Sequence, residues 1–365
     1  MSNATAASPA APVANRGAIT ACVILSVIMQ ALDTTIANVA LPHIQGDVSA
    51  SSDQINWVLT SYIVAAAIMT PPSGFLSAKF GRKRVLLVAI AGFVAASVLC
   101  GLSESLIQIV GFRLLQGLFG ASLVPLSQGI LLDIYNVEER GRAMALFGVS
   151  VMVGPVLGPV IGGWLTDNIS WRWVFYINVP IGALAFFGIV VYVTETKLDA
   201  LAKLDWFGFG MLSLAIAGLQ LFLDRGEQLD WFYSTEIIIE ALVCVSAFYL
   251  FLVHMFTAER SFVNPRLFMD QNFAVSILFI FIVGVTYLAS LALMTPYLQT
   301  LMGYPVVTAG IVMGPRGVGT MVCMFLVGRL IGKVDTRWLL FIGLALTAWA
   351  MYDMTGWTPN VSQWT

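Results

Sequence analysis

Charged side chains lie inside three long apolar segments of the sequence, as Asp33, Arg113 and Arg316. A charge in the interior of a lipid bilayer is costly, so an ionisable residue there is a candidate for function. Removal from water disfavours the charged form of a carboxylate, so we predict that Asp33 takes up and releases a proton. A carboxylate held by hydrogen bonds for packing is the alternative, and an acid at this place would also attract a cationic substrate.

The two arginines need partners of their own, because a guanidinium group stays charged in proteins. Gln116 follows Arg113 by three residues on the same predicted helix, and Asp33 is a candidate partner from another segment. We predict that Arg113 tunes proton exchange at Asp33, with a purely structural anchor as the alternative. We predict that Gln116 lines a central cavity and could contact a substrate. Arg316, in the stretch MGPRGVGTM, either lines the same cavity or caps a broken helix.

The segments that carry these residues are those of an all-α polytopic membrane protein. Hydrophobic residues make up 59% of the chain and charged residues only 10%, whereas soluble domains contain about 25% charged residues. Apolar runs of about 20 residues are long enough to cross a bilayer as helices. They predict eleven transmembrane helices, at about 18–40, 55–78, 85–103, 106–133, 143–165, 173–193, 206–223, 235–256, 273–299, 306–328 and 337–355.

The lysines and arginines predict how these helices are oriented. With the N-terminal tail in the cytoplasm, all but four of the 18 basic residues fall on the cytoplasmic side. The exceptions are Arg172 and Arg225 in outside loops and the two arginines inside apolar segments. Cytoplasmic connections carry such an excess of positive charge. We therefore predict a multi-pass protein of the cell inner (plasma) membrane with a cytoplasmic N-terminus.

The composition gives little reason to expect an enzyme. A net charge of −2 provides no argument for a nucleic-acid partner. The two histidines and four cysteines lack the spacing of metal ligands, and no ATP-binding or hydrolase motif is found. We predict no catalytic residues, no metal and no cofactor. Energy would come from an ion gradient, and the expected partners are the lipid bilayer and a small-molecule substrate.

An internal repeat suggests how the chain is divided. GFLSAKFGRKRVLL, from Gly74, aligns with GRLIGKVDTRWLLF, from Gly328, so the second predicted helix pairs with the tenth. Such repeats are typical of transporters. We predict a disordered cytoplasmic tail (1–16), a six-helix half (17–193), a linker with two extra transmembrane helices (194–256) and an incomplete second half with three helices (257–365).

Small residues and prolines are concentrated in GVSVMVGPVLGPVIGGW. Gly154, Gly158 and Gly162 recur every four residues and share one helix face, where they allow another helix to approach closely. Pro155 and Pro159 each remove a backbone donor. Tight packing alone would explain this pattern. The functional interpretation is a compliant helix at the seam between the two halves.

Several motifs together resemble the major facilitator superfamily, specifically the fourteen-spanner drug:proton antiporters of the EmrB/QacA type. They are ALDTTIANVALP, GFLSAKFGRKR, FRLLQGLFGA, the glycine and proline stretch above, SWRWVFYINVPIG and LFMDQNFAV. The resemblance implies the major facilitator fold with two inserted central helices. Because a second six-helix half would need three more spanning segments, we expect that the C-terminal end is truncated.

The loop that carries Gly74, Gly81, Arg82 and Arg84 matches the superfamily's cytoplasmic motif, which implies a role in gating. Ala78 stands where the common pattern has an aspartate that joins a charge network between helices, so this network is in doubt here. Topology alone would also explain the basic residues. We assign Asp133 to the charged loop that follows it rather than to the transport pathway.

The resemblance implies proton-coupled efflux of amphipathic, often cationic, drugs or other small organic compounds by alternating access. Asp33 would exchange the proton and Arg113 would tune it. A periplasmic adaptor and an outer-membrane channel are partners that the resemblance implies. The alternatives are a proton-coupled uptake permease of the same fold and a non-transporting membrane scaffold or receptor, which would not need Asp33 or Arg113 in the bilayer.

Overall fold

The computed structural model describes residues 15–358, with gaps at 197, 200–203, 259–260, 262, 305 and 332, and the predicted disordered tail falls almost entirely outside this range. Regular structure within it is helical, apart from an isolated bridge between Ile331 and Val334. The helices are α1 (Arg16–Asp47), α2 (Ser52–Ile55), α3 (Trp57–Met69), α4 (Ser73–Phe80), α5 (Arg82–Gly101), α6 (Leu106–Gly120), α7 (Leu123–Ile134), α8 (Val137–Asn168), α9 (Trp173–Tyr176), α10 (Asn178–Tyr192), α11 (Trp206–Arg225), α12 (Thr235–Thr257), α13 (Gln271–Pro296), α14 (Val306–Leu330) and α15 (Thr336–Met354), with the short turns η1 (Trp231–Tyr233), η2 (Pro265–Met269) and η3 (Tyr297–Leu301).

Each predicted apolar segment coincides with a helix or with a broken helix. Among the described residues, seven helical segments are long and apolar enough to cross a membrane, and α3 with α4 forms an eighth if this bent pair is one span. The final three predicted segments correspond to α13, α14 and α15. The all-α polytopic architecture is thereby confirmed, while the count of eleven spanning helices stays a prediction.

The bend between α3 and α4 has a local cause. The two helices meet at 54°, and Pro71 and Pro72 lie between them. Proline has no backbone N–H to donate and its ring disfavours a helical conformation in the residue before it. The apolar run predicted as one segment is therefore two helices.

Helix α1 lies at the centre of the first part of the chain and packs against α8, α10 and α7. Two buried apolar clusters surround it. The first includes Met29, Phe93 and Ile189, and the second includes Ile36 and Phe175. α1 is therefore held on several sides, which fixes the positions of the polar side chains that it carries.

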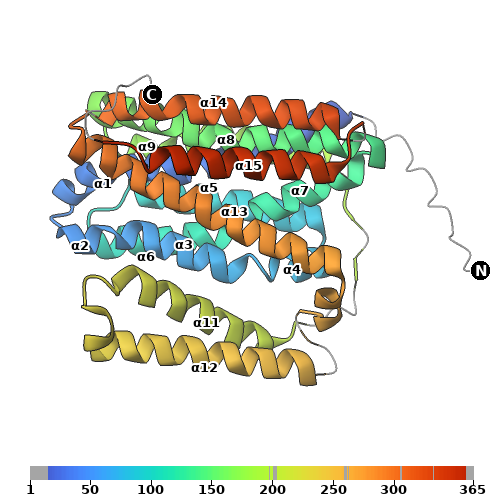
Figure 1. Cartoon of the computed structure of the whole chain (residues 1–365), viewed down its shortest axis with the longest axis horizontal. Helices are drawn as coiled ribbons and strands as arrows, with labels where there is room; N and C mark the ends of the chain where they lie inside the picture. Colours follow the sequence, from blue (N-terminus) through green and yellow to red (C-terminus); the bar gives the residue numbers. More distant parts are fainter. Residues whose placement is uncertain are drawn as a thin grey trace, which may run out of the picture.

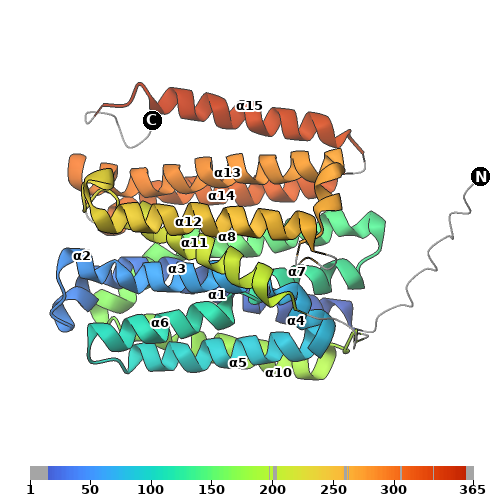
Figure 2. The ribbon, with the colours of Figure 1, turned by 90° about the horizontal axis from the view of Figure 1, so that it is seen from below.

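Helix α8 lies between this first group of helices and the later part of the chain. It packs extensively against α1 and also against α14 (Figure 2). α11 and α12 form a hairpin beside α3, where Thr60 donates a hydrogen bond to Asp224 at 2.7 Å (Figure 1). α15 runs along the edge of the molecule and has no buried residue among those described.

Candidate functional site

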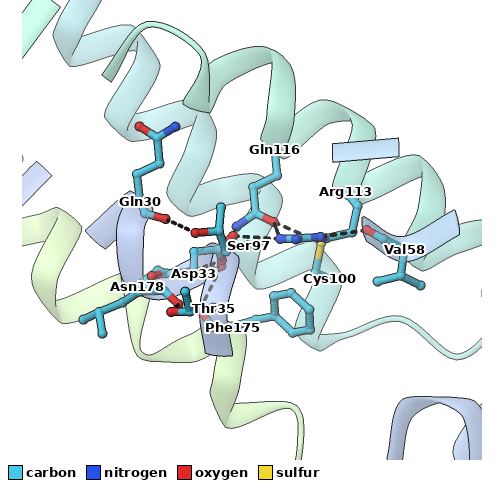
Figure 3. Close-up of polar contacts among 12 residues, drawn as sticks. Gln30, Asp33, Thr35, Val58, Ser97, Cys100, Arg113, Gln116, Phe175 and Asn178 are labelled. Atoms are coloured by element: carbon cyan, nitrogen blue, oxygen red, sulfur yellow. Dashed lines mark hydrogen bonds and ion pairs between the residues drawn. The ribbon is translucent and has the colours of Figure 1, made fainter. Parts of the chain in front are cut away.

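A buried polar network joins α1, α6 and α10 at Asp33. One carboxylate oxygen of Asp33 accepts a hydrogen bond from Arg113 Nη1 at 2.7 Å. The other accepts from Gln116 Nε2 and from Asn178 Nδ2, both at 2.7 Å. All four residues have no exposed surface, and Figure 3 shows their side chains converging. The predicted candidates Asp33, Arg113 and Gln116 therefore lie in direct contact.

The guanidinium group of Arg113 is held on further sides. Nε donates to the carbonyl oxygen of Val58 at 3.1 Å, and Nη1 also donates to Gln116 Oε1 at 2.8 Å. The ring of Tyr62 lies 4.4 Å from Arg113 Cζ, and the ring of Phe175 lies 5.7 Å away. A buried charge is tolerated when it is paired and hydrogen-bonded in this way. Arg113 is thereby fixed with its charge directed at Asp33.

A second layer of hydrogen bonds orients Asn178. Its Nδ2 donates to Ser97 Oγ at 2.8 Å, and Ser97 donates in turn to the carbonyl oxygen of Phe175 at 2.9 Å. Neither Asn178 nor Ser97 is among the residues predicted from the sequence. Asn178 could have been found as the amide side chain inside the apolar stretch YINVPIG. Ser97 offers no such signal, because small hydroxyl residues are common in transmembrane helices.

The predicted glycine face of α8 lies against α1 beside this network. A Cβ atom on Gly154 would collide with the carbonyl group of Ala31, and one on Gly158 would collide with the Thr35 hydroxyl. Thr35 Oγ1 also donates to the carbonyl oxygen of Gly154 at 3.0 Å. A Cβ atom on Gly162 would lie 3.1 Å from Ile36 Cγ2, which is a tight contact but not a collision. The glycines therefore bring the α8 backbone directly against the segment of α1 that carries Asp33.

The opposite side of α8 faces α14. A Cβ atom on Gly317 of α14 would collide with Val156, and one on Gly328 would collide with Ala145. α8 continues as one helix through Pro155 and Pro159. Its glycine face therefore contacts α1, which belongs to the same predicted half, and its opposite face contacts α14 of the predicted second half. α8 lies at the predicted seam, but Gly154, Gly158 and Gly162 are on the side of α8 away from it.

The predicted cytoplasmic loop contains a charge network built from unexpected acids. Arg82 pairs with Asp133 at the end of α7. Glu195, which follows α10, accepts hydrogen bonds from the backbone N–H groups of Lys83 and Arg84 at 3.0 and 3.1 Å. The prediction that Ala78 puts this network in doubt is therefore wrong, and Asp133 belongs to it. The acids of this network come from elsewhere in the chain, since Asp133 lies 51 positions after Arg82 and Glu195 lies 112 positions after Lys83.

Gly81 allows the close approach of Glu195, and a matched pair of variants tests this. Its φ of 93° lies in the left-handed region, and a Cβ atom there would collide with the Glu195 carboxylate. With a ψ of 141° this is a conformation that essentially only glycine adopts, so we expect Gly81→Ala to destabilise the protein by about 1–3 kcal/mol from the backbone alone, seen as a lower melting temperature in detergent. Gly74→Ala is the control, because no atom lies within 4 Å of its added Cβ. Equal melting temperatures for the two variants would contradict the packing described.

Arg316 is not part of the Asp33 network. Its Nη2 donates to Ser290 Oγ at 2.6 Å and to the carbonyl oxygen of Tyr287 at 3.3 Å, both on α13. α14 continues as a helix from Val306 to Leu330 through the residues around it. The alternative in which Arg316 caps a broken helix is therefore wrong.

An all-helical, polytopic bundle with a buried charge network at its centre defines an integral membrane protein. Residues 23–364 match the model of the Major Facilitator Superfamily, and the chain belongs to this superfamily. It is 39% identical to the fatty acid resistance protein FarB of Neisseria gonorrhoeae over 91% of this chain and 66% of that protein. It is 37% identical to the multidrug export protein EmrB of Escherichia coli (strain K12) over 90% of this chain and 64% of that protein. The chain thus spans just under two thirds of the length of these relatives.

Solved structures support the same fold. The proton:xylose symporter XylE superimposes with a TM-score of 0.54, at 16% sequence identity, over 85% of this chain and 68% of that structure. The human organic anion transporter MFSD10 superimposes with a TM-score of 0.53, at 18% identity, over 86% of this chain and 72% of that structure. The predicted major facilitator fold and the resemblance to multidrug exporters are confirmed.

Proposed function

We propose that this protein exports amphipathic, often cationic, small organic compounds across the inner membrane in exchange for protons. The observation that carries the proposal is the buried Asp33–Arg113 pair, in which a carboxylate and a guanidinium meet with no exposed surface. Ionisable side chains inside a membrane are energetically costly, and where they occur they usually mark a substrate, ion or proton pathway. The relatives named for multidrug export and fatty acid resistance support export as the direction.

Protonation of Asp33 is the proposed coupling step. The charged carboxylate accepts three hydrogen bonds from Arg113, Gln116 and Asn178. A bound proton removes the negative charge that holds Arg113 and occupies one acceptor site. The network would then rearrange. Thr35, two residues after Asp33, donates a hydrogen bond to the Gly154 carbonyl of α8, so a shift of α1 at this point would be passed on to α8. Proton uptake would in this way favour one arrangement of the seam over the other.

Alternating access would follow from motion at this seam. In the proposed division, residues 17–193 form one half, 194–256 carry the inserted helices and 257–365 belong to the second half. The two faces of α8 join α1 on one side with α14 on the other. Rocking of halves about a site near the middle of the membrane is how transporters with internal repeats operate. Gly154, Gly158 and Gly162 would let α8 shift against α1 within the first half, and Gly317 and Gly328 of α14 would let the second half pack closely against α8 at the seam.

The remaining parts of the proposal concern energy, orientation and partners. Among the described residues, no group of three or more histidine, cysteine or acidic side chains could hold a metal ion. The proton gradient is the proposed energy source, and the N-terminus is placed in the cytoplasm. A periplasmic adaptor and an outer-membrane channel are proposed partners on the basis of the family resemblance.

Proton movement in everted membrane vesicles tests the proposed function. Vesicles that contain the full-length protein are energised so that the lumen is acidic, and a quenched dye reports the lumenal pH. An exporter that exchanges substrate for protons raises the lumenal pH when ethidium is added outside. Vesicles without the protein are the control. No response across a broad panel of compounds would contradict antiport, and proton uptake driven by substrate in right-side-out vesicles would establish the uptake permease instead.

A further inference from the structure

Asn178 has an unused hydrogen-bond acceptor beside Asp33. Its Nδ2 donates to Asp33 Oδ1 at 2.7 Å and to Ser97 Oγ at 2.8 Å. Its Oδ1 is buried and has no hydrogen-bond partner among the described residues, and the residue as a whole has no exposed surface. A buried polar atom without a partner is rare in a native protein and calls for a physical explanation. Only the donor end of this amide is therefore in use in the arrangement described.

The charge of Asp33 explains which end of the amide faces it. An ionised carboxylate can only accept hydrogen bonds, so Asn178 must direct its N–H donors toward it. A protonated carboxyl group differs, because its O–H is a donor that needs an acceptor. The amide of Asn178 can supply either kind of group, since its two ends have nearly the same shape and its terminal torsion has two broad minima.

The other two partners of Asp33 have no acceptor to offer a proton at this place. Arg113 carries N–H donors only. Gln116 Oε1 already accepts from Arg113 Nη1 at 2.8 Å and from Cys100 Sγ at 3.8 Å. A rotation of the Gln116 amide would turn its NH2 group against the guanidinium donors. Of the three residues that donate to Asp33, only Asn178 therefore has a free acceptor.

We propose that Asn178 is a further proton-coupling residue, whose side-chain amide rotates when Asp33 takes up a proton. The proposal rests on the proposed proton exchange. The incoming proton forms an O–H bond at Asp33 Oδ1, and this O–H donates to Asn178 Oδ1 in place of the bond from Nδ2. When the proton leaves, the reverse rotation returns the N–H donor to the charged carboxylate. Asp33 thus has a matching partner in both protonation states, and no other group gains or loses a proton.

The rotation is passed on to two further helices through Ser97. In the charged state Ser97 accepts from Asn178 and donates to the carbonyl oxygen of Phe175 at 2.9 Å. After the rotation Ser97 meets the amide oxygen, so its hydroxyl must turn to donate to that oxygen, and the Phe175 carbonyl loses its donor. Ser97 lies on α5 and Phe175 on α9 (Figure 3). A proton bound on α1 thereby loosens a contact between α5 and α9.

Infrared spectroscopy of the purified full-length protein in nanodiscs tests the rotation in the wild type. The side-chain amide carbonyl groups of asparagine are isotopically labelled, so that their bands stand apart. We expect one labelled band to move to lower wavenumber as the pH falls, because Asn178 Oδ1 gains hydrogen bonds. The same movement should be lost in the Asp33→Asn variant. If no labelled band moves in a way that depends on Asp33, the proposal is wrong.

Asn178→Leu removes the amide and keeps a side chain of similar size. We expect the carbonyl band of protonated Asp33 to move to higher wavenumber, as in a carboxylic acid whose O–H has no acceptor. Proton release driven by ethidium in everted vesicles should fall about tenfold or more, as the loss of a hydrogen bond to a charged group implies. An amide that only orients the charged carboxylate would leave the band of the protonated acid in place.

Asn168→Leu is the matched control for Asn178→Leu. Asn168 is an exposed asparagine whose Nδ2 donates to the carbonyl oxygen of Trp164 at 2.9 Å. This variant should keep the Asp33 band in place and release protons as the wild type does. The labelled wild-type protein decides the question even if Asn178→Leu does not fold.

The outcomes separate this inference from the proposed function. If Asn178→Leu leaves the band of protonated Asp33 in place, or if vesicles with this variant release protons as the wild type does, the inference is wrong while proton-coupled export stands. If the labelled band moves with the protonation of Asp33 but no compound drives proton release from wild-type vesicles, the rotation is supported and proton-coupled export is overturned.

Discussion

Replacing Asp33 with asparagine should abolish proton release driven by substrate, down to the level of vesicles without the protein. Asparagine has nearly the same shape and keeps one oxygen that accepts from Gln116 and Asn178. It cannot exchange a proton at neutral pH. It also leaves the buried charge of Arg113 without its counterion, which in other proteins costs about 3–5 kcal/mol of stability. The measurement is the lumenal pH of everted vesicles, together with the melting temperature of the purified variant.

Two further variants separate coupling from stability at Asp33. The double variant Asp33→Asn with Arg113→Gln removes both charges, so it should recover part of the lost stability while proton release stays absent. Asp224→Asn is the matched control, because Asp224 is an exposed carboxylate that also accepts a hydrogen bond, from Thr60. Vesicles that contain the Asp224→Asn variant should release protons as vesicles with the wild type do. Full proton release by the Asp33→Asn variant would remove Asp33 from the coupling path.

Replacing Gly154 with alanine should have the largest effect of any change on the α8 face. The added Cβ atom would collide with the backbone carbonyl of Ala31, and backbone moves aside much less easily than a flexible side chain. Overpacking typically costs about 1–3 kcal/mol, and here it also separates α1 from α8 beside Asp33. We expect a lower melting temperature in detergent and a loss of proton release.

Gly111→Ala provides the comparison for Gly154→Ala. Gly111 lies within α6, and an added Cβ atom there has no neighbour within 4 Å. Alanine is favoured over glycine in a helix by about 1 kcal/mol, so this variant should be at least as stable as the wild type. If Gly154→Ala melted at the same temperature as Gly111→Ala, α8 would not lie against α1 as closely as described.

The sequence predicts the charged centre of the site because charges are rare in apolar segments. Asp33 and Arg113 stand out for this reason, although their contact spans 80 positions and no local pattern indicates it. Asn178 is missed because an amide is a smaller departure from an apolar run than a charge is. Ser97 contacts the network only by accepting a hydrogen bond from Asn178. This contact joins α5 to α10, so it can be found only once the two helices are placed next to each other.

Other features depend on contacts that a sequence does not encode locally. The break between α3 and α4 is hidden because Pro71 and Pro72 interrupt a run that remains apolar throughout. The charge network of the cytoplasmic loop is missed because Glu195 lies 112 positions after Lys83. The superfamily pattern places an acid at position 78, where this chain has Ala78. The acid that accepts hydrogen bonds from the first turn of α5 is instead Glu195, which follows α10.

The pairing of Asp33 with Arg113 also constrains how the protein is made. The two residues are 80 positions apart in the chain, and ribosomes add about 5–20 residues per second. About 4–16 seconds therefore pass after synthesis of Asp33 before Arg113 exists. During this interval α1 has no counterion for its carboxylate. Either α1 enters the lipid with Asp33 protonated, or it waits at the insertion machinery until α6 arrives. The order of membrane insertion is thus tied to the same carboxylate that would carry the transported proton.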